Sequence, residues 1–111
     1  MVKYRSGQLD AVYGAISHPV RRSVLERLRP GRATVTELAA HYPISLVAVS
    51  KHIRVLEAAG LVRRTVDGRE HHLALEPGSL LQAADWLDRY RQFWEERLEL
   101  LDARVRARKR R

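Results

Sequence analysis

Four residues between positions 45 and 58 carry side chains suited to binding rather than to reaction, and they recur at steps of three and four. They are Val47, Ser50, Lys51 and Arg54. On an α-helix this spacing places them in one exposed line, and the small Ala48 beside them allows close approach. A hydroxyl can hydrogen-bond a base or a phosphate, while ammonium and guanidinium groups can neutralise phosphate or read guanine. Ser45 is a favourable N-cap residue for this helix. The free backbone N–H groups of the first turn are then expected to form a docking point for a phosphate.

Taken alone, this line of side chains is also compatible with an ordinary solvated helix face. Lysine and arginine on a helix surface usually mean no more than that. The secondary-structure elements around this line are therefore needed to distinguish the two interpretations.

The chain of 111 residues suits one compact domain, and its net charge is +8 with a pI of about 10.8. A basic balance points to polyanions, of which nucleic acid is the commonest. Six of the positive charges lie in the last eight residues, RVRARKRR, and without them the net charge would be +2. The charge therefore predicts a basic tail more than a basic domain. This tail is either a solvated end or a contact to DNA phosphate.

Composition also excludes several kinds of site. The absence of cysteine excludes disulfides and thiolate metal sites. No apolar stretch approaches the roughly 20 residues of a membrane span. The opening residues, MVKYRSGQLD, lack the apolar region of a signal peptide. We therefore expect a cytoplasmic protein that does not bind a membrane.

The first part of the chain predicts three short helices. The first carries four apolar residues on one face: Leu9, Val12, Tyr13 and Ile16. Pro19 suits the first turn of a second helix, which ends at Arg29-Pro30-Gly31. Thr34 and Glu37 have the spacing of a capping box at the start of a third helix, with Thr36 as an alternative cap.

The fourth helix contains the line of binding residues and is followed by a β-hairpin. Its apolar set is Val49, Ile53 and Leu56, and Gly60 is a natural residue to end it. In residues 61–75 the hydrophobic period changes from that of a helix to that of a strand. Within them Asp67-Gly68 is the strongest short-range turn signal.

Taking Asp67-Gly68 as a two-residue turn predicts the register of the hairpin. The opposed pairs are then Val66 with Arg69, Arg64 with His71, and Val62 with Leu73. Three apolar residues share the face near the base of the hairpin, where they can pack on the helices: Val62, Leu73 and Leu75. Four basic residues are expected at a projecting tip: Arg63, Arg64, Arg69 and His71.

From Ser79 to about Val105 one long helix is predicted. Its heptad positions are Leu80, Ala84, Leu87, Arg91, Trp94, Leu98, Leu101 and Val105, and Trp86, Tyr90, Phe93 and Leu100 widen the stripe. The small core of the remaining chain cannot cover such a helix, so we expect a second copy of the protein as its partner. The alternative is a docking patch for another protein. It is less favoured because aromatic residues at helical spacing are usually core.

The order of elements is helix, turn, helix, glycine stop and basic hairpin. A short helix, a three-residue turn and a second helix make a helix-turn-helix, whose second helix lies in the major groove of DNA. A hairpin in this position serves as a wing that reaches an adjacent minor groove or the backbone. The predicted fold is therefore mainly α with a small β-hairpin, a winged helix-turn-helix.

Three segments resemble the ArsR-type winged-helix repressors of bacteria and archaea. They are ISHPVRRSVLERL, VTELAAHYPISLVAVSKHIRVLEAAGLV and RRTVDGREHHLAL, which together cover residues 16–75 in the family's order. The stretch VSKHIRVLEAAGLV is the most distinctive. The later segment AADWLDRYRQFWEERLELL resembles the C-terminal helix of a subgroup of these repressors.

This resemblance implies a homodimer that presents two recognition helices to a palindromic operator in double-stranded DNA and represses transcription. The DNA contacts are expected from the recognition helix 45–58 and the wing 61–75: Ser45, Val47, Ala48, Ser50, Lys51, Arg54, Arg63, Arg64, Arg69 and His71. The dimer interface is expected from the first and last helices: Leu9, Val12, Tyr13, Ile16, Leu87, Tyr90, Trp94, Leu98 and Leu101. The winged-helix domain with its dimerisation helices would span residues 1–105, and the basic tail residues 106–111.

The chain departs from the metal-sensing members of that family. One of their sites is E-L-C-x-C-D-L on the third helix, where this chain has Glu37-Leu38-Ala39-Ala40-His41. Another uses Asp and His on the C-terminal helices, and residues 79–111 contain no histidine. We therefore expect no metal and no cofactor. Four of the histidines are expected to be structural: His18, His52, His71 and His72. The signal that releases DNA stays open among a small apolar ligand, a partner protein and no inducer.

Two other function classes compete with a repressor. An enzyme has little support, because the chain has no Gly-rich phosphate loop and no cysteine nucleophile, and Asp85 and Asp88 fit a solvated, ion-paired face. A non-specific or architectural nucleic-acid-binding protein would rest on the basic tail and the net charge. Displacement from DNA by random sequence as readily as by a palindrome would distinguish that class from a sequence-specific repressor.

Overall fold

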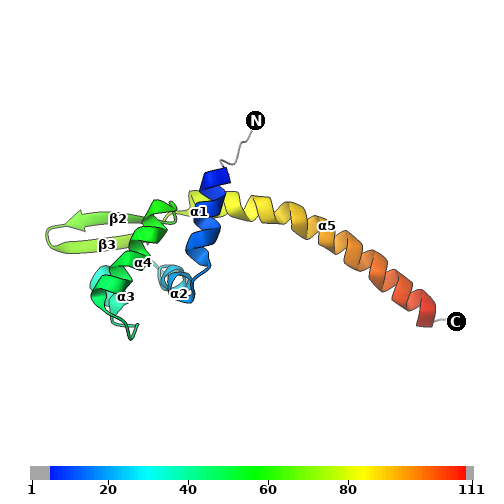
Figure 1. Ribbon diagram of the computed structural model, residues 1–111, viewed down its shortest axis with the longest axis horizontal. Helices are drawn as coiled ribbons and strands as arrows, with labels where there is room; N and C mark the ends of the chain where they lie inside the picture. Colours follow the sequence, from blue (N-terminus) through cyan, green and yellow to red (C-terminus); the bar gives the residue numbers. More distant parts are fainter. Residues whose placement is uncertain (1–5, 110–111) are drawn as a thin grey trace.

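The computed structural model describes residues 6–109, which form five helices and three short strands within that range (Figure 1). In chain order they are α1 (Ser6–Ile16), α2 (Pro19–Arg27), β1 (Ala33–Thr34), α3 (Val35–Ala39), α4 (Leu46–Ala58), β2 (Val62–Asp67), β3 (Glu70–Leu75) and α5 (Pro77–Lys109). The predicted mainly helical winged helix-turn-helix is confirmed. Helices α3 and α4 form the helix-turn-helix, and β2 and β3 form the wing.

Helix boundaries follow the capping residues of the sequence. His18 caps α2, its side chain accepting a hydrogen bond from the Val20 N–H, and Pro19 is the first helical residue. Thr34 rather than Thr36 caps α3, because the Thr34 hydroxyl accepts from the Glu37 N–H and the Glu37 carboxylate accepts in return from the Thr34 N–H.

The two ends of α4 also match the sequence. The Ser45 hydroxyl oxygen accepts a hydrogen bond from the Ala48 N–H at 3.1 Å, which fixes the start of the helix. Gly60 lies just past the end with φ of 74°, a left-handed conformation that favours glycine. Residues 40–45 join α3 to α4, a longer connection than the three-residue turn expected from the sequence.

The sheet contains one strand more than expected and a shifted hairpin register. Strand β1, which the sequence did not predict, pairs antiparallel with β3 in the order β1-β3-β2. In the hairpin Val66 opposes His71 and Asp67 opposes Glu70, so the turn is Gly68-Arg69 and not Asp67-Gly68. Gly68 has φ of 62°, which suits the first position of a type II′ turn.

This shift moves each residue of β3 by two positions along β2. Val62 therefore opposes Leu75, and Arg64 opposes Leu73, where the expected partners were Leu73 and His71. Because side chains alternate with a period of two, the shift leaves every residue on its predicted face. Val62, Leu73 and Leu75 still line the base of the wing, where Val62 and Leu73 are buried.

One core joins the helices to the base of the sheet. Its buried members come from every helix and both long strands: Val12, Ala15, Val24, Leu28, Leu38, Val49, Ile53, Leu56, Ala59, Leu61, Val62, Leu73 and Ala83. The apolar residues predicted for α4 are all completely buried. This core therefore holds α4 by one face and leaves its opposite face in solvent.

Helix α5 leaves this body and extends away from it, in the direction opposite to the hairpin (Figure 1). Its main contact with the body is through α1: Ala83 is buried, the Tyr13 hydroxyl donates to the Ala83 carbonyl at 2.8 Å, and Tyr13 meets Trp86 edge-on. The helix continues to Lys109, four residues beyond the predicted end near Val105, so no break separates the expected domain from the first part of the basic tail. Residues 110 and 111 lie outside the described range.

Candidate nucleic-acid interface

The outer face of α4 presents most of the predicted line of side chains. Lys51 and Arg54 are exposed, and Val47 keeps 65% of its surface in solvent although it is apolar. Ser50 and Ala48 are half-buried at the edge of the same face. The helix N-terminus at Ser45 is exposed as well, so its free N–H groups are accessible.

A groove separates this helix from the wing. It has a volume of about 520 Å³ and is open to solvent. The start of α3 contributes Thr34 and Thr36, α4 contributes Leu46 and Ser50, and the wing contributes Arg64, Arg69, Glu70 and His71. Three hydroxyl-bearing residues and the side chains of the wing therefore line one open hollow next to the exposed line.

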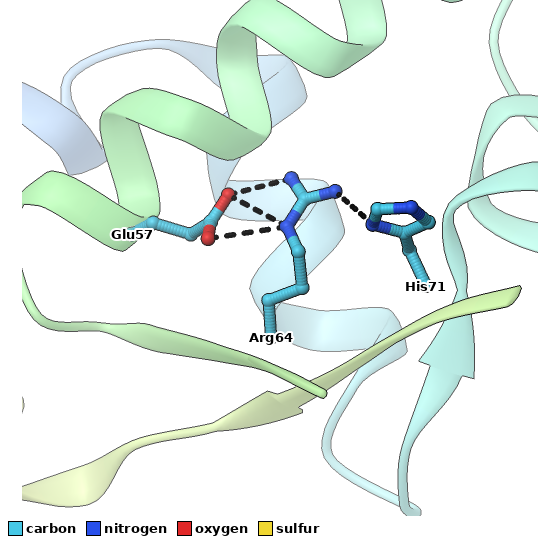
Figure 2. A network of polar contacts seen from close by, with 3 residues as sticks. All are labelled: Glu57, Arg64 and His71. Carbon is cyan, nitrogen blue, oxygen red and sulfur yellow. Dashed lines mark hydrogen bonds and ion pairs between the residues drawn. The ribbon is translucent and has the colours of Figure 1, made fainter. Parts of the chain in front are cut away.

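Arg64 does not lie at the tip of the wing, which corrects the sequence-based expectation. It stands opposite Leu73 near the base, and its side chain turns back towards α4 (Figure 2). Its Nη2 lies 2.6 Å from Oε1 of Glu57, and its Nε donates to Oε2 at 3.2 Å. Its Nη1 contacts Nδ1 of His71 at 3.0 Å. The guanidinium is thus occupied within the protein.

The hydrogen bonds and the charge of Glu57 raise the pKa of Arg64, against the opposing effect of burial. Three quarters of each side chain in this pair is shielded from solvent. The same arginine also engages Nδ1 of His71, so the guanidinium of Arg64 has no nitrogen left for a phosphate. Glu57 was not among the residues expected from the sequence to shape this surface. The available signal was a pair of opposite charges on the last turn of a helix and the first strand after it.

The other basic residues of the wing are placed differently. Arg63 also lies near the base, opposite Ala74, and its side chain points to the other face of the hairpin. It is exposed and only 3.8 Å from Glu76. Arg69 belongs to the turn itself and is exposed. Of the four residues expected at the tip, Arg69 lies in the turn and His71 opposes Val66, in the second pair from the turn.

Two histidines pack together where the start of α2 meets α4. The rings of His18 and His52 stack with centroids 4.4 Å apart, and Nδ1 of His52 lies 3.1 Å from Nη1 of Arg21. Because a guanidinium only donates, this nitrogen of His52 must accept and the ring is neutral. Desolvation first, then the charges of His18 and Arg21, lower the pKa of His52. The structure gives His18 and His52 the structural role that the sequence predicted.

The residues expected at a dimer interface divide into two groups. Val12 has no exposed surface and belongs to the core of the protomer, so it cannot itself contact a partner. Leu9, Tyr13 and Ile16 are half-buried and pack against that core. The members on α5 are exposed: Leu87 by 49%, Tyr90 by 52%, Trp94 by 58%, Leu98 by 59% and Leu101 by 56%.

Arg91, which interrupts this stripe, has partners on its own helix. Its Nη2 lies 2.7 Å from the Asp88 carboxylate, and its Nε lies 4.0 Å from that of Glu95.

Within residues 6–109, no three histidine or carboxylate side chains gather so as to hold a metal ion. None of the helices described here is both long and apolar enough to cross a bilayer.

Comparison with known proteins bears on this arrangement directly. Residues 16–65 match a helix-turn-helix domain family. The chain is 38% identical over 90 residues to the HTH-type transcriptional regulator Rv2034 of Mycobacterium tuberculosis, covering 81% of this chain and 82% of the relative. It is 37% identical to the crystal structure of the ArsR family transcriptional regulator RHA00566, with a TM-score of 0.78, covering 86% of this chain and 97% of that one. The chain belongs to the ArsR family of transcriptional regulators.

A further relative extends the comparison. The chain is 29% identical over 79 residues to the transcriptional repressor SdpR of Bacillus subtilis, covering 71% of this chain and 88% of the relative. The resemblance inferred from the sequence segments is thereby confirmed. This ArsR-family protein is a sequence-specific DNA-binding regulator, and the relatives that carry functional names are regulators rather than enzymes.

Proposed function

We propose that this ArsR-family protein is a homodimeric cytoplasmic repressor that binds a palindromic operator. The observation that carries the proposal is the outer face of α4. It exposes Val47, Lys51 and Arg54 beside a projecting hairpin with Arg69 at its turn. A helix with this surface fits the major groove, and the hairpin fits the neighbouring backbone or minor groove.

Each side chain then has a defined task. Val47, Ala48, Ser50 and Arg54 face base edges, where the small residues permit close approach and Arg54 can read guanine. Ser45, Lys51, Arg63 and Arg69 meet phosphates, which fix the register of the protein on the duplex. Arg64 is left out of the phosphate contacts because its three nitrogens already bind within the protein, and the same guanidinium engages Nδ1 of His71.

The dimer is supported by the exposed apolar stripe of α5. Nothing in residues 6–109 covers Trp94, Leu98 or Leu101, which are each more than half exposed. An apolar hollow of about 430 Å³ lies between α1 and the first turns of α5, lined by Leu9, Tyr13, Trp86 and Leu87. In a twofold dimer the stripe of one protomer can cover the hollow and stripe of the other. The two recognition helices then meet half-sites about 34 Å apart.

The experiment is selection of bound DNA from a random library with purified protein at physiological salt. We expect enrichment of a palindrome whose half-sites are one helical turn apart. Arg54→Ala protein, run in parallel, should enrich a site with relaxed preference at one position in each half. Tight, salt-sensitive binding without any enriched sequence would contradict the proposal and would favour a non-specific binder that relies on the basic end of α5.

A further inference from the structure

The contacts around Arg64 form a three-residue network between the recognition helix and the wing. Glu57 lies in the last turn of α4, Arg64 on β2 and His71 on β3 (Figure 2). We propose that this wing network sets the position of the wing relative to α4. Arg64 is then a positioning residue for DNA binding and not a phosphate contact. The inference rests on the proposed function, in which helix and wing engage one duplex together.

The geometry of Arg64 supports a fixed orientation. A guanidinium offers its donors in one rigid plane, and here all three nitrogens have partners. Nε and Nη2 bind the two oxygens of Glu57, and Nη1 binds His71. A two-point contact to a carboxylate restrains direction as well as distance. The side chain therefore ties both strands of the hairpin to one turn of α4.

The wing needs such a restraint because its outer part has little other support. Strand β1 pairs with β3 only at Leu73 and His72, so the pairs nearer the turn form a ribbon of two strands. The core also stops at Leu73, and Val66 beyond it is 57% exposed. A hairpin of two strands is marginally stable in water by itself. Arg64 stands opposite Leu73, where the core ends and the ribbon begins.

His71 extends the network across the hairpin. The guanidinium can only donate, so Nδ1 of His71 accepts and the ring of a neutral His71 carries its proton on Nε2. The ring lines the groove beside Ser50 and Arg69. Holding this ring also fixes one wall of the hollow that faces DNA.

A phosphate contact by Arg64 and a positioning role predict opposite effects of Glu57→Gln. If Arg64 served phosphate, removing the competing carboxylate would free the guanidinium and tighten DNA binding. If Arg64 positions the wing, the neutral amide weakens the network and operator affinity falls by about fivefold to tenfold. The readout is the dissociation constant for the selected operator over a range of salt concentrations. Tighter binding by this variant would overturn the proposal.

Matched variants remove the general effect of charge. Glu76→Gln takes away one carboxylate near the base of the wing without touching α4, and should tighten binding slightly by electrostatics. Arg69→Gln, at the exposed turn, should lower the slope of log affinity against log salt by about one. Arg64→Gln should reduce affinity with the wild-type slope. A reduced slope for Arg64→Gln would instead assign it to a phosphate.

The double variant Glu57→Arg with Arg64→Glu guards against simple misfolding. It restores an ion pair in reverse, so it should recover much of the affinity that Arg64→Glu loses, whereas a phosphate contact could not be recovered in this way. Hydrogen exchange of the β2 and β3 amides in the free protein tests the network without DNA. Faster exchange in Glu57→Gln is expected. Unchanged exchange would overturn the wing network even if the DNA selection had yielded an operator and so supported the proposed function.

Discussion

Helices α4 and α5 have similar apolar patterns and opposite surroundings. In α4 the apolar residues Val49, Ile53 and Leu56 are completely buried, and the opposite face exposes Lys51 and Arg54 together with Val47. In the outer part of α5 the apolar residues are on the surface, with Trp94 and Leu98 almost 60% exposed. One helix is held by its own chain, and the other has its apolar face unpaired within residues 6–109.

The two exposed faces fit different kinds of partner outside the protomer. The exposed face of α4 carries Lys51 and Arg54 beside small side chains, which fits the phosphates and base edges of DNA. The exposed face of α5 is apolar, so its partner is another apolar surface. In the proposed dimer, a second protomer would supply that surface and would place a second α4 at the spacing of a half-site.

The largest expected effect comes from disrupting the α5 stripe. Trp94→Glu with Leu98→Glu should give monomers, because buried carboxylates at the centre of an apolar interface are costly. Operator affinity should fall by about a hundredfold or more, since two linked half-sites become separate binding events. Sedimentation and operator titration measure the two effects. Gln92→Glu with Ala103→Glu, off the heptad stripe, is the charge-matched control, and an unchanged dimer in the stripe variant would assign that surface to another partner.

The second effect concerns the polar face of α4. Arg54→Ala should cost about 1–3 kcal/mol of discrimination between operator and random DNA, as expected for loss of a base contact. The ratio of the two dissociation constants measures it. Arg29→Ala removes an exposed arginine of similar charge outside α4 and should leave the ratio unchanged. An equal loss of affinity for both DNAs in Arg54→Ala would place this residue on phosphate.

A third prediction tests the junction where the end of α4 meets the start of α5. A Cβ on Gly60 would lie 2.6 Å from the Ser79 hydroxyl, and the backbone there has φ of 74°. Gly60→Ala should therefore lower the free energy of unfolding by about 1–2 kcal/mol. Gly68→Ala is the matched control, because its φ is similar at 62° but no atom lies within 4 Å of a Cβ. Urea unfolding should show the smaller loss for Gly68→Ala, and equal losses would mean that crowding at Ser79 is unimportant.

The smallest expected effect is a pH dependence of stability that arises from His52 on α4. The pKa of His52 is lowered in the folded protein, so the unfolded chain takes up a proton more readily. This contribution to stability is complete above the ordinary histidine pKa of about 6.5 and is lost as the pH falls from there through the folded value. Urea unfolding at several pH values between about 5 and 7.5 should show a shallower decline for His52→Gln than for wild type. Identical declines would show that His52 does not contribute.

Local signals in the sequence predicted the elements well. The period of apolar residues located the helices, and Ser45, Thr34 and Gly60 marked their ends because caps depend on neighbouring backbone groups. The wing was predicted from its alternating pattern, but its turn was placed one residue too early. Both Asp67-Gly68 and Gly68-Arg69 contain a glycine suited to a tight turn, and the two registers bury the same faces.

Contacts between residues far apart in the sequence were harder to predict. Strand β1 has only two residues, too few for a detectable period, and exists because it pairs with β3. Val12 was expected at the interface because the resemblance implies that the first helix lies there, and Val12 is on the apolar face of that helix. That position does not tell whether the covering surface belongs to the same chain. Arg64 looked like one more basic residue of a wing until its distance to Glu57 was known.

By itself, the sequence determined the helix-turn-helix, the wing, the polar line on α4 and the apolar stripe on α5. These follow from periodicity, capping and side-chain chemistry, which act over a few residues. The tertiary structure alone decided which charges are free. Lys51, Arg54 and Arg69 remain exposed, while Arg64 is bound by Glu57 and His71. The physical reason is that an ion pair depends on the distance between two elements, and only packing of the hairpin against α4 sets that distance.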